Sequence, residues 1–294
     1  KNLLANLRTS AIGTASKNRI ASGAGHPPKR SANAMFTNVI VKTPCRAVTE
    51  GITSAPELGK PDYEKALRQH GCYIEALKQC GVEVTVLPPD EAFPDSCFVE
   101  DTAVLTEKCA VISNPGAPTR ARETEAMVPV IKQFYPEECI EYITAPGTME
   151  GGDVMMVGDT FYIGRSARTN AEGIRQFTEI LGRYGYRVVE VPLEKVLHLK
   201  TGVNYLEHGH MLVSGEFTSK AEFAAYQRHE IPEAEAYAAN CIWVNEKVLV
   251  PEGYPTVEKL VREMGYEVIL VDTSEFRKID GGLSCLSLRF RAMR

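Results

Sequence analysis

This 294-residue sequence lacks both long hydrophobic runs and cysteine pairs of the metal-binding kind. Its longest apolar stretches, such as Val268 to Val271, have the size of a strand, whereas a membrane-spanning helix needs about 18 apolar residues or more. The eight cysteines include no CxxC pair and no cysteine and histidine spacing of the zinc-finger type. We therefore expect neither a membrane span nor a structural metal.

The sequence also lacks an excess of basic residues. It carries 33 Lys and Arg against 38 Asp and Glu, for a formal net charge of -5. Because nucleic-acid binding requires a basic surface, this balance argues against a nucleic-acid partner and fits a cationic or small-molecule one. With 44% hydrophobic residues the chain can bury a large core without disulfides, and no stretch resembles a secretory signal. We expect reduced thiols and a cytoplasmic location.

Residues 1–34 differ from the rest of the chain. They contain Lys and Arg but no acidic residue, and they are rich in Ser, Ala and Gly. An acid-poor stretch of this kind can be a transit peptide, but we interpret it as a disordered or extraneous tail before Met35. Residues 35–294 are then expected to form a single α/β domain.

A repeated unit organises this domain: an amphipathic helix, a glycine that ends it, and a short apolar strand. The three clearest helices run from Pro61 to Gly81, from Thr169 to Gly185 and from Pro255 to Gly265. Thr169 and Glu172 have the spacing of a capping box, which predicts that the second helix begins there. Alternating helices and strands are typical of the α/β class.

Each unit is followed by a charged or reactive residue. Counted from the glycine that ends the helix, Asp95 follows by 14 residues, His198 by 13 and Cys285 by 20. A fourth candidate is Glu150, which precedes two glycines and the strand 154–157, although the unit before it lacks the glycine. If the repeats surround a common axis, these four side chains converge there.

Cys285 follows a glycine pair in the segment GGLSCLSL, where we expect it to enter a final strand. A buried structural cysteine is the alternative. A reactive cysteine needs a nearby cation or histidine to make its thiolate available, and His198 is the candidate, although its apolar neighbours also suit a core histidine. Glu150 is either an exposed turn acid or the group that orients this histidine. Together the three form a Cys-His-Glu set of nucleophile, base and orienting carboxylate.

The segment PDSCFVED places three acids around an aromatic residue: Asp95, Phe98, Glu100 and Asp101. A solvated acidic loop is one interpretation. The other is a site for a planar cation, because the donors of a guanidinium match paired carboxylates.

Two arginines and two histidines complete the candidates. Arg120 and Arg168 each stand where a helix begins, which suits an anion such as a carboxylate, although surface arginines are usually only solvated. His208 and His210 have the residue types of a metal site, but no second cluster completes it, so we predict no metal there.

Six segments, taken together, resemble the dimethylarginine dimethylaminohydrolase family of the guanidine-modifying, or pentein, superfamily. The segments are LGKPDYEKALRQH, PDSCFVEDTAVL, NPGAPTRARE, MEGGDV, LHLKTG and GGLSCLSLRF. The resemblance extends over residues 36–290. It implies a five-bladed α/β propeller with pseudo-fivefold symmetry, in agreement with the repeats, and a catalytic domain that needs no cofactor.

The resemblance also assigns a role to each candidate residue. It implies Cys285 as the nucleophile, His198 as the general acid and base, and Glu150 as the triad carboxylate. The remaining residues would bind substrate: Asp101 with Glu100 nearby at the guanidinium, Phe98 in the same segment, Asp95 at the α-amino group, Arg120 and Arg168 at the α-carboxylate, and Leu58 in a mobile lid.

The implied activity is hydrolysis of Nω-methylated arginines to citrulline and methylamine or dimethylamine, through a covalent thiouronium intermediate on cysteine. An arginine deiminase or another substituted-guanidine hydrolase is the alternative, because the same triad serves all of them. A protein that binds arginine derivatives without turnover is a third interpretation. The oligomeric state stays open, with a homodimer compatible with the sequence.

Overall fold

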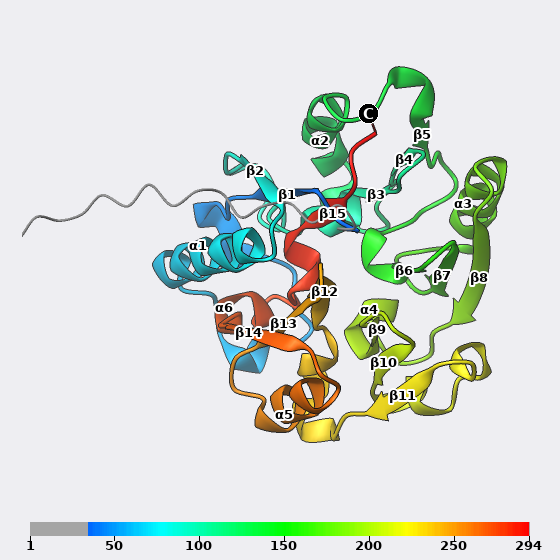
Figure 1. The fold of residues 1–294 in the computed structure, drawn as a ribbon. Coiled ribbons are helices and arrows are strands. Elements are labelled where there is room, and N and C mark those ends of the chain that lie inside the picture. The colour runs from blue at the N-terminus through cyan, green and yellow to red at the C-terminus, as the bar shows by residue number, and fades with distance from the viewer. Residues whose placement is uncertain (1–34, 294) are drawn as a thin grey trace, which may run out of the picture.

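Five small sheets arranged around a common centre form the body of the protein (Figure 1). The computed structural model describes residues 35–293, so the tail predicted for residues 1–34 lies outside the described residues. Within 35–293, fifteen strands form five three-stranded sheets. This arrangement confirms the predicted five-bladed α/β propeller.

The five sheets share one topology, in which the first strand is antiparallel to the middle strand and the middle strand is parallel to the third. Four sheets are continuous in sequence: β3 (Ala103–Leu105), β4 (Ala110–Ile112) and β5 (Ile140–Tyr142); β6 (Val154–Val157), β7 (Thr160–Arg165) and β8 (Arg187–Pro192); β9 (Val203–Tyr205), β10 (His210–Val213) and β11 (Gln227–Glu230); β12 (Ile242–Val244), β13 (Lys247–Pro251) and β14 (Glu267–Val271). The fifth joins the two ends of the domain: β15 (Leu288–Phe290), β1 (Asn38–Lys42) and β2 (Glu83–Leu87). Pairing of Asn38 with both Phe290 and Glu83 closes the ring.

A helix connects the middle and third strands of four sheets. These helices are α1 (Tyr63–Gln79), α2 (Glu123–Ile131), α3 (Ala171–Arg183) and α5 (Pro255–Glu263), with the shorter α4 (Leu199–Gly202) and α6 (Ser274–Arg277) elsewhere. In the sheet β9-β10-β11, the 3₁₀ turns 215–219 and 221–223 take the place of the helix. No helix in residues 35–293 has the length and apolar character needed to cross a membrane.

The predicted helix boundaries hold for α1 and α5 but not for the start of α3. The Asp62 side chain caps α1 by accepting a hydrogen bond from Lys65 N at 2.7 Å. The capping box predicted at Thr169 is wrong, because Asn170 is the capping residue and accepts from Gly173 N at 2.8 Å. The hydroxyl of Thr169 donates instead to the buried carboxylate of Asp153 at 2.6 Å.

Apolar side chains fill the spaces between neighbouring sheets in five clusters. On α1, for example, Tyr73 and Leu77 are fully buried and pack with Phe276. Beside the sheet β9-β10-β11, Phe217 and Phe223 of the 3₁₀ turns supply core side chains. Burial of this apolar surface stabilises the contacts between sheets.

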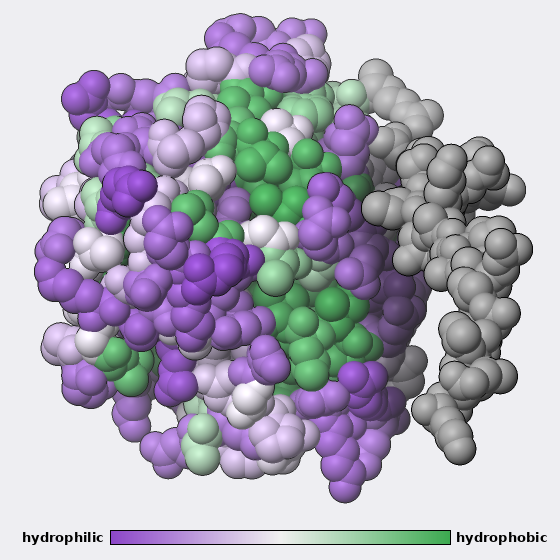
Figure 2. All heavy atoms as spheres, turned by 90° about the vertical axis from the view of Figure 1, so that its left-hand side faces the viewer, coloured by the Kyte–Doolittle hydropathy of each residue, from purple (hydrophilic) through white to green (hydrophobic). Residues whose placement is uncertain are grey.

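One face of the molecule carries exposed apolar surface. Figure 2 shows hydrophobic residues gathered on the side that bears α1 and β14 in Figure 1. Among the elements of this side, Val86 on β2 is 48% exposed and Leu270 on β14 is 42% exposed. Both residues belong to third strands, which form the outer edges of their sheets.

The repeat places the candidate catalytic residues at equivalent positions. Asp101, Glu150, His198 and Cys285 each lie in or next to a short helical turn that leads into the first strand of a sheet. These turns contact one another near the centre of the ring. The expectation that Cys285 enters a strand is wrong, because it lies in the 3₁₀ turn 284–286 and β15 begins at Leu288.

Candidate active site

Three of the four side chains predicted to converge, Asp95, His198 and Cys285, line a common cavity, and the fourth, Glu150, is hydrogen-bonded to His198. The volume of this cavity is about 30 Å³, and Asp95, Asp101, Arg168, His198 and Cys285 all contribute to its wall. A second cavity of about 50 Å³ adjoins it and shares both His198 and Cys285. The two reactive side chains therefore stand at the junction of two compartments.

Cys285 is a half-buried thiol in a turn that brings backbone close to its sulfur. Gly282 N donates a hydrogen bond to Sγ at 3.4 Å. Burial, together with the negative charges of Glu100 and Asp101, raises the pKa of Cys285 to about 12. The thiol is consequently protonated at neutral pH, and a cation entering the cavity would favour its thiolate.

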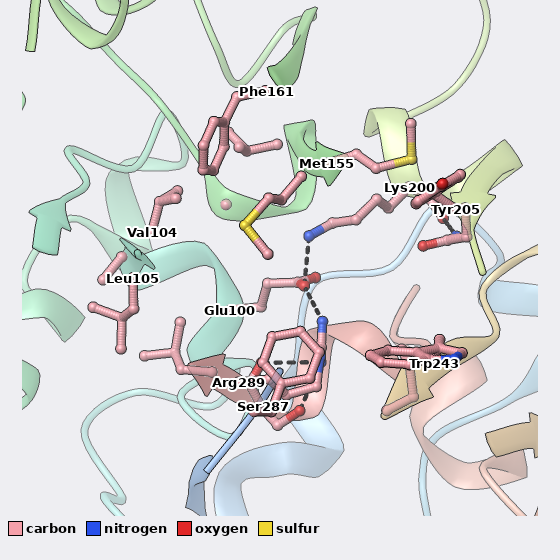
Figure 3. A pocket seen from close by; sticks show the side chains of 18 of the residues that line it. Glu100, Val104, Leu105, Met155, Phe161, Lys200, Tyr205, Trp243, Ser287 and Arg289 are labelled. Carbon is pink, nitrogen blue, oxygen red and sulfur yellow. Dashed lines mark hydrogen bonds and ion pairs between the residues drawn. The ribbon is translucent and has the colours of Figure 1, made fainter. Parts of the chain in front are cut away.

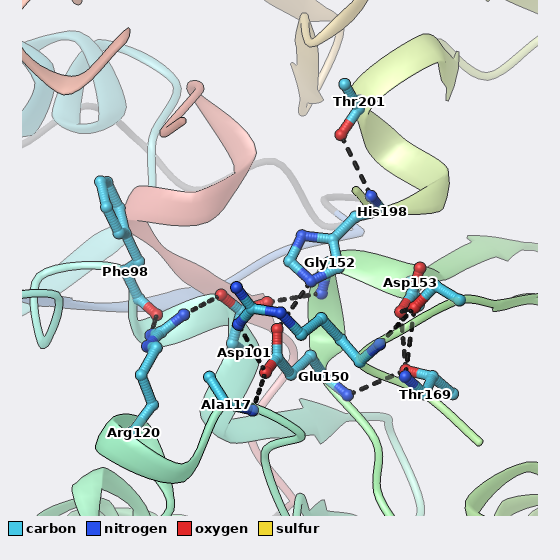
Figure 4. A network of polar contacts seen from close by, with 12 residues as sticks. Phe98, Asp101, Ala117, Arg120, Glu150, Gly152, Asp153, Thr169, His198 and Thr201 are labelled. Carbon is cyan, nitrogen blue, oxygen red and sulfur yellow. Dashed lines mark hydrogen bonds and ion pairs between the residues drawn. The ribbon is translucent and has the colours of Figure 1, made fainter. Parts of the chain in front are cut away.

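His198 is bound to Glu150 deep in the protein, as Figure 4 shows. The distance from Nε2 to Glu150 Oε2 is 2.7 Å, and Glu150 has no exposed surface. Burial acts to lower the pKa of His198, but Asp101, Glu150 and Asp153 outweigh it and raise the value to about 9. The imidazole is therefore protonated at neutral pH and can act as an acid.

Gly152 allows this close packing around the histidine. A Cβ atom at position 152 would lie 2.8 Å from His198 Nδ1 and 3.0 Å from Asp101 Oδ1. The Gly152 amide donates to Asp101 Oδ1 at 2.9 Å. Gly152 thus leaves room for both the His198 ring and the Asp101 carboxylate.

Asp101 is held charged by Arg120. Arg120 is 4% exposed, and its guanidinium donates to Asp101, to the side chain of Glu123 and to the carbonyl oxygen of Phe98. Burial raises the pKa of Asp101, but the charges of Arg120 and His198 outweigh this and lower it to about 2. The carboxylate therefore presents a fixed negative charge at the cavity wall.

The far part of the cavity contains a second acid and a second arginine. Asp95 Oδ1 accepts from Ile52 N at 3.0 Å, and burial raises the pKa of this carboxyl. The Arg168 side chain is 18% exposed and donates to Glu150 Oε1 at 3.3 Å. Phe98 lines the same wall, where a Cβ atom at Gly281 would come within 2.3 Å of its ring.

Three predicted site residues do not line this cavity: Glu150, which is hydrogen-bonded to His198 of its wall, Glu100 and Leu58. The Glu100 carboxylate accepts from Lys200, Arg289 and the Ser284 hydroxyl, and it faces a separate cavity of the structure. It is the neighbour of Asp101 in sequence but points elsewhere because successive side chains of the 3₁₀ turn 99–102 diverge.

Leu58 likewise lies away from the cavity. It is 38% exposed in the 3₁₀ turn 56–58, whereas Ile52, six residues earlier, lines the cavity. Hydrogen bonds from Ser54 N and Ser54 Oγ to the Asp280 carboxylate, at 2.7 and 2.9 Å, fasten this loop beside Cys285. The apolar residue that the loop contributes is therefore Ile52.

Sequence reasoning missed Asn240, which connects the two reactive turns. Its Oδ1 accepts from Ser284 N at 2.8 Å, and its Nδ2 donates to Ser284 Oγ at 3.0 Å and to Lys200 O at 3.1 Å. Ser284 precedes Cys285, and Lys200 lies two residues after His198. A polar residue next to the apolar run Cys241–Val244 was the available signal.

Within residues 35–293, one group of side chains could bring three metal-ligand atoms together. Asp101, Glu150 and His198 place theirs within 4.8 Å of one another. Asp101 is already paired with Arg120, and Glu150 with His198, so hydrogen bonds and charge account for the group. His208 pairs with Glu246 instead, and His210 with His229.

Comparisons with known proteins agree with this arrangement. Residues 58–222, more than half of the chain, match the family model of N,N dimethylarginine dimethylhydrolase, eukaryotic. The N(G),N(G)-dimethylarginine dimethylaminohydrolase of Pseudomonas aeruginosa is 58% identical and covers 87% of this chain and 100% of its own length.

Solved structures show the same relationship. A mutant of the Pseudomonas aeruginosa dimethylarginine dimethylaminohydrolase, complexed with citrulline, has a TM-score of 0.86 and covers 87% of this chain and 100% of its own. The N-terminal domain of a cyanobacterial arginine dihydrolase bound to its product has a TM-score of 0.75 at 20% identity, covering 88% of this chain and 98% of its own, which shows a shared fold alone. By family model, sequence identity and structure, the chain belongs to the dimethylarginine dimethylaminohydrolase family.

Proposed function

We propose that this protein hydrolyses Nω-methylated arginines to citrulline and methylamine or dimethylamine, with Cys285 as the nucleophile. The observation that carries the proposal is the common cavity in which Cys285, the His198–Glu150 pair and Asp101 meet. A thiol, a protonated imidazole and a fixed carboxylate are the groups needed to attack a cationic carbon, protonate a departing amine and hold the cation.

Substrate binding uses charges of both signs in this cavity. Asp101, with its pKa held near 2, binds the guanidinium, since a carboxylate matches its planar donors. Asp95 takes the α-amino group. Arg168 is the principal partner of the α-carboxylate because its side chain retains exposed surface, and the more deeply buried Arg120 lines the same wall.

The first chemical step forms a bond between Cys285 and the substrate. Burial and the charges of Glu100 and Asp101 raise the pKa of Cys285, and the bound guanidinium offsets those charges. Cys285 therefore releases its proton to solvent and becomes a thiolate only beside substrate. The thiolate attacks the guanidinium carbon, and His198 donates its proton to the methylated nitrogen. The carbon–nitrogen bond breaks, the neutral amine leaves, and a cationic thiouronium remains on the sulfur.

The second step returns the enzyme to its starting state. His198, now neutral, accepts a proton from water, and the resulting hydroxide attacks the thiouronium carbon. Collapse of this adduct breaks the carbon–sulfur bond, the hydroxyl proton of the adduct passes to the departing sulfur, and citrulline is released. Glu150 stabilises the imidazolium that forms and keeps the ring in place.

The second cavity is the proposed compartment for the leaving amine. Tyr237, Asn240 and Gly282 line it, and it meets the first cavity at His198 and Cys285. This position supports proton transfer from His198 to a nitrogen that carries methyl groups. The α-amino and α-carboxylate groups would occupy the other compartment.

We further propose one catalytic domain over residues 35–294, a cytoplasmic location and a homodimer. All eight cysteines are free thiols, which suits a reducing compartment. The exposed apolar side chains of Val86 and Leu270, on outer edge strands, support self-association through that face.

Parallel incubation with asymmetric dimethylarginine, monomethylarginine and arginine, followed by a citrulline assay, tests the proposed activity. We expect citrulline from the methylated substrates, little from arginine, and none when Cys285→Ser is used. Arginine as the best substrate would reassign the protein as a deiminase, and the absence of citrulline from all three would reject hydrolysis.

A further inference from the structure

A larger cavity lies along the axis of the propeller, next to the proposed active site, and shares Lys200 with the compartment proposed for the leaving amine. Its volume is about 130 Å³, and residues of the first strands of all five sheets, β3, β6, β9, β12 and β15, line it. Neither Cys285 nor His198 contributes to its wall. A cavity of this size accommodates a small organic molecule.

One end of this cavity carries two cations for one carboxylate. Figure 3 shows Lys200 and Arg289 approaching Glu100 from opposite sides. Both donate to the same oxygen, Oε1, at 2.5 and 3.2 Å, while Oε2 accepts from Ser284 Oγ at 2.8 Å. Glu100 is 4% exposed and Lys200 is 8% exposed. This end therefore has an excess of one positive charge away from bulk water, which favours an anion.

The walls and a further acid restrict what kind of anion fits. Val104, Leu105, Met155 and Trp243 provide apolar surface along the walls. The further acid among the lining residues is Glu207, in the turn that follows β9. A negative charge on Glu207 opposes a second carboxylate on the ligand.

We propose that this axial cavity binds a small monocarboxylate with a short apolar body, whose carboxylate lies beside Glu100 and between Lys200 and Arg289. The two cations, Lys200 and Arg289, exceed the single acid Glu100 by one positive charge and therefore favour a carboxylate on the ligand. The apolar walls select an aliphatic or aromatic body. The further acid, Glu207, selects against dicarboxylates.

Occupancy of the cavity is coupled to the nucleophile through Glu100. A carboxylate that engages Lys200 and Arg289 weakens their hold on Glu100, whose other oxygen accepts from Ser284, the residue before Cys285. The ligand therefore alters turnover without competing with substrate. Binding itself does not depend on the proposed activity and can be measured without it.

Trp243 provides a direct measurement, because it is the single tryptophan of the sequence and it lines the cavity. Its Nε1 is buried and has no hydrogen-bond partner in the described part of the chain. Valerate titrated into the protein is expected to change Trp243 fluorescence saturably. Valeramide, which has the same body without the charge, and glutarate, which has a second carboxylate, should each bind at least tenfold more weakly.

Two controls separate this cavity from the active site. Val104→Phe fills the cavity and should abolish the valerate response while citrulline binding is retained; Met155→Phe serves if that variant does not fold. Saturating citrulline should leave the valerate response in place. The proposal is overturned by a response that is not saturable, that survives both filling variants, that valeramide equals, or that citrulline removes.

Discussion

Replacing Glu150 by Gln is expected to lower the pKa of His198 and thereby narrow the pH range of activity. Glutamine keeps the size of the side chain but removes the negative charge that lies 2.7 Å from Nε2. The pKa of His198 is about 9, against an ordinary value of 6.5. That difference of about 2.5 corresponds to about 3 kcal/mol in favour of the protonated imidazole.

Asp101, Glu150 and Asp153 together stabilise the protonated imidazole by more than about 3 kcal/mol, because burial of His198 acts in the opposite direction and lowers its pKa. Asp101 and Asp153 remain in the variant, so we expect the loss of Glu150 to lower the pKa by about 1 to 2. NMR titration of histidine ring signals measures it, with His198→Asn used to assign the resonance among six histidines. The alkaline limb of kcat should shift to lower pH by the same amount.

Glu150→Gln should also lower the free energy of unfolding by an amount that depends on pH. A folded-state pKa raised above 6.5 stabilises the fold below pH 6.5, and this contribution is lost as the pH rises through 9. Glu150→Gln should therefore reduce the free energy of unfolding more at pH 6 than at pH 10, and in the His198→Asn background this pH dependence should disappear. A His198 pKa that stays near 9 in Glu150→Gln would refute the reasoning.

Three further substitutions test other parts of the site. Asn240→Ala should lower kcat about 10- to 100-fold with little change in KM, because about 1–3 kcal/mol of hydrogen bonding between the reactive turns is lost. The control Asn204→Ala removes another buried amide bonded to Lys200 O and should retain kcat. Equal losses of kcat in both variants would reject the positioning role of Asn240. Arg168→Met should raise KM for dimethylarginine but not for its analogue without the carboxylate, and an equal effect on both would exclude the assigned contact. Gly281→Ala should destabilise the protein by about 1–3 kcal/mol in thermal or urea unfolding, since its Cβ would lie 2.3 Å from the Phe98 ring, and an unchanged Tm would show that the ring moves freely.

The repeating architecture could be predicted from the sequence because each repeat is marked by local sequence patterns. Periodic apolar residues and a terminating glycine mark α1, α3 and α5 and the strands that follow them. The repeat that contains β9, β10 and β11 was not visible in the sequence, since β11 reads Gln227-Arg228-His229-Glu230 and no long helix precedes it. Its core comes from Phe217 and Phe223 in 3₁₀ turns, which leave no helical period.

The direction of individual side chains was harder to predict than their convergence. Glu100 and Asp101 are adjacent and chemically alike, yet one faces the axial cavity and the other the proposed active site. Ile52 and Leu58 are both apolar residues of one loop, and the hydrogen bonds of this loop to Asp95 and Asp280 hold Ile52 at the cavity. Such outcomes depend on contacts between residues far apart in sequence.

The most direct test of the central proposal is to look for substrate on Cys285. The enzyme would be mixed with asymmetric dimethylarginine, quenched with acid within the first turnover, digested and analysed by mass spectrometry. We expect the peptide that contains Cys285 to gain the mass of the substrate less dimethylamine before citrulline formation reaches its steady rate. Citrulline formed at full rate with Cys285 unmodified, or by the Cys285→Ser variant, would contradict it.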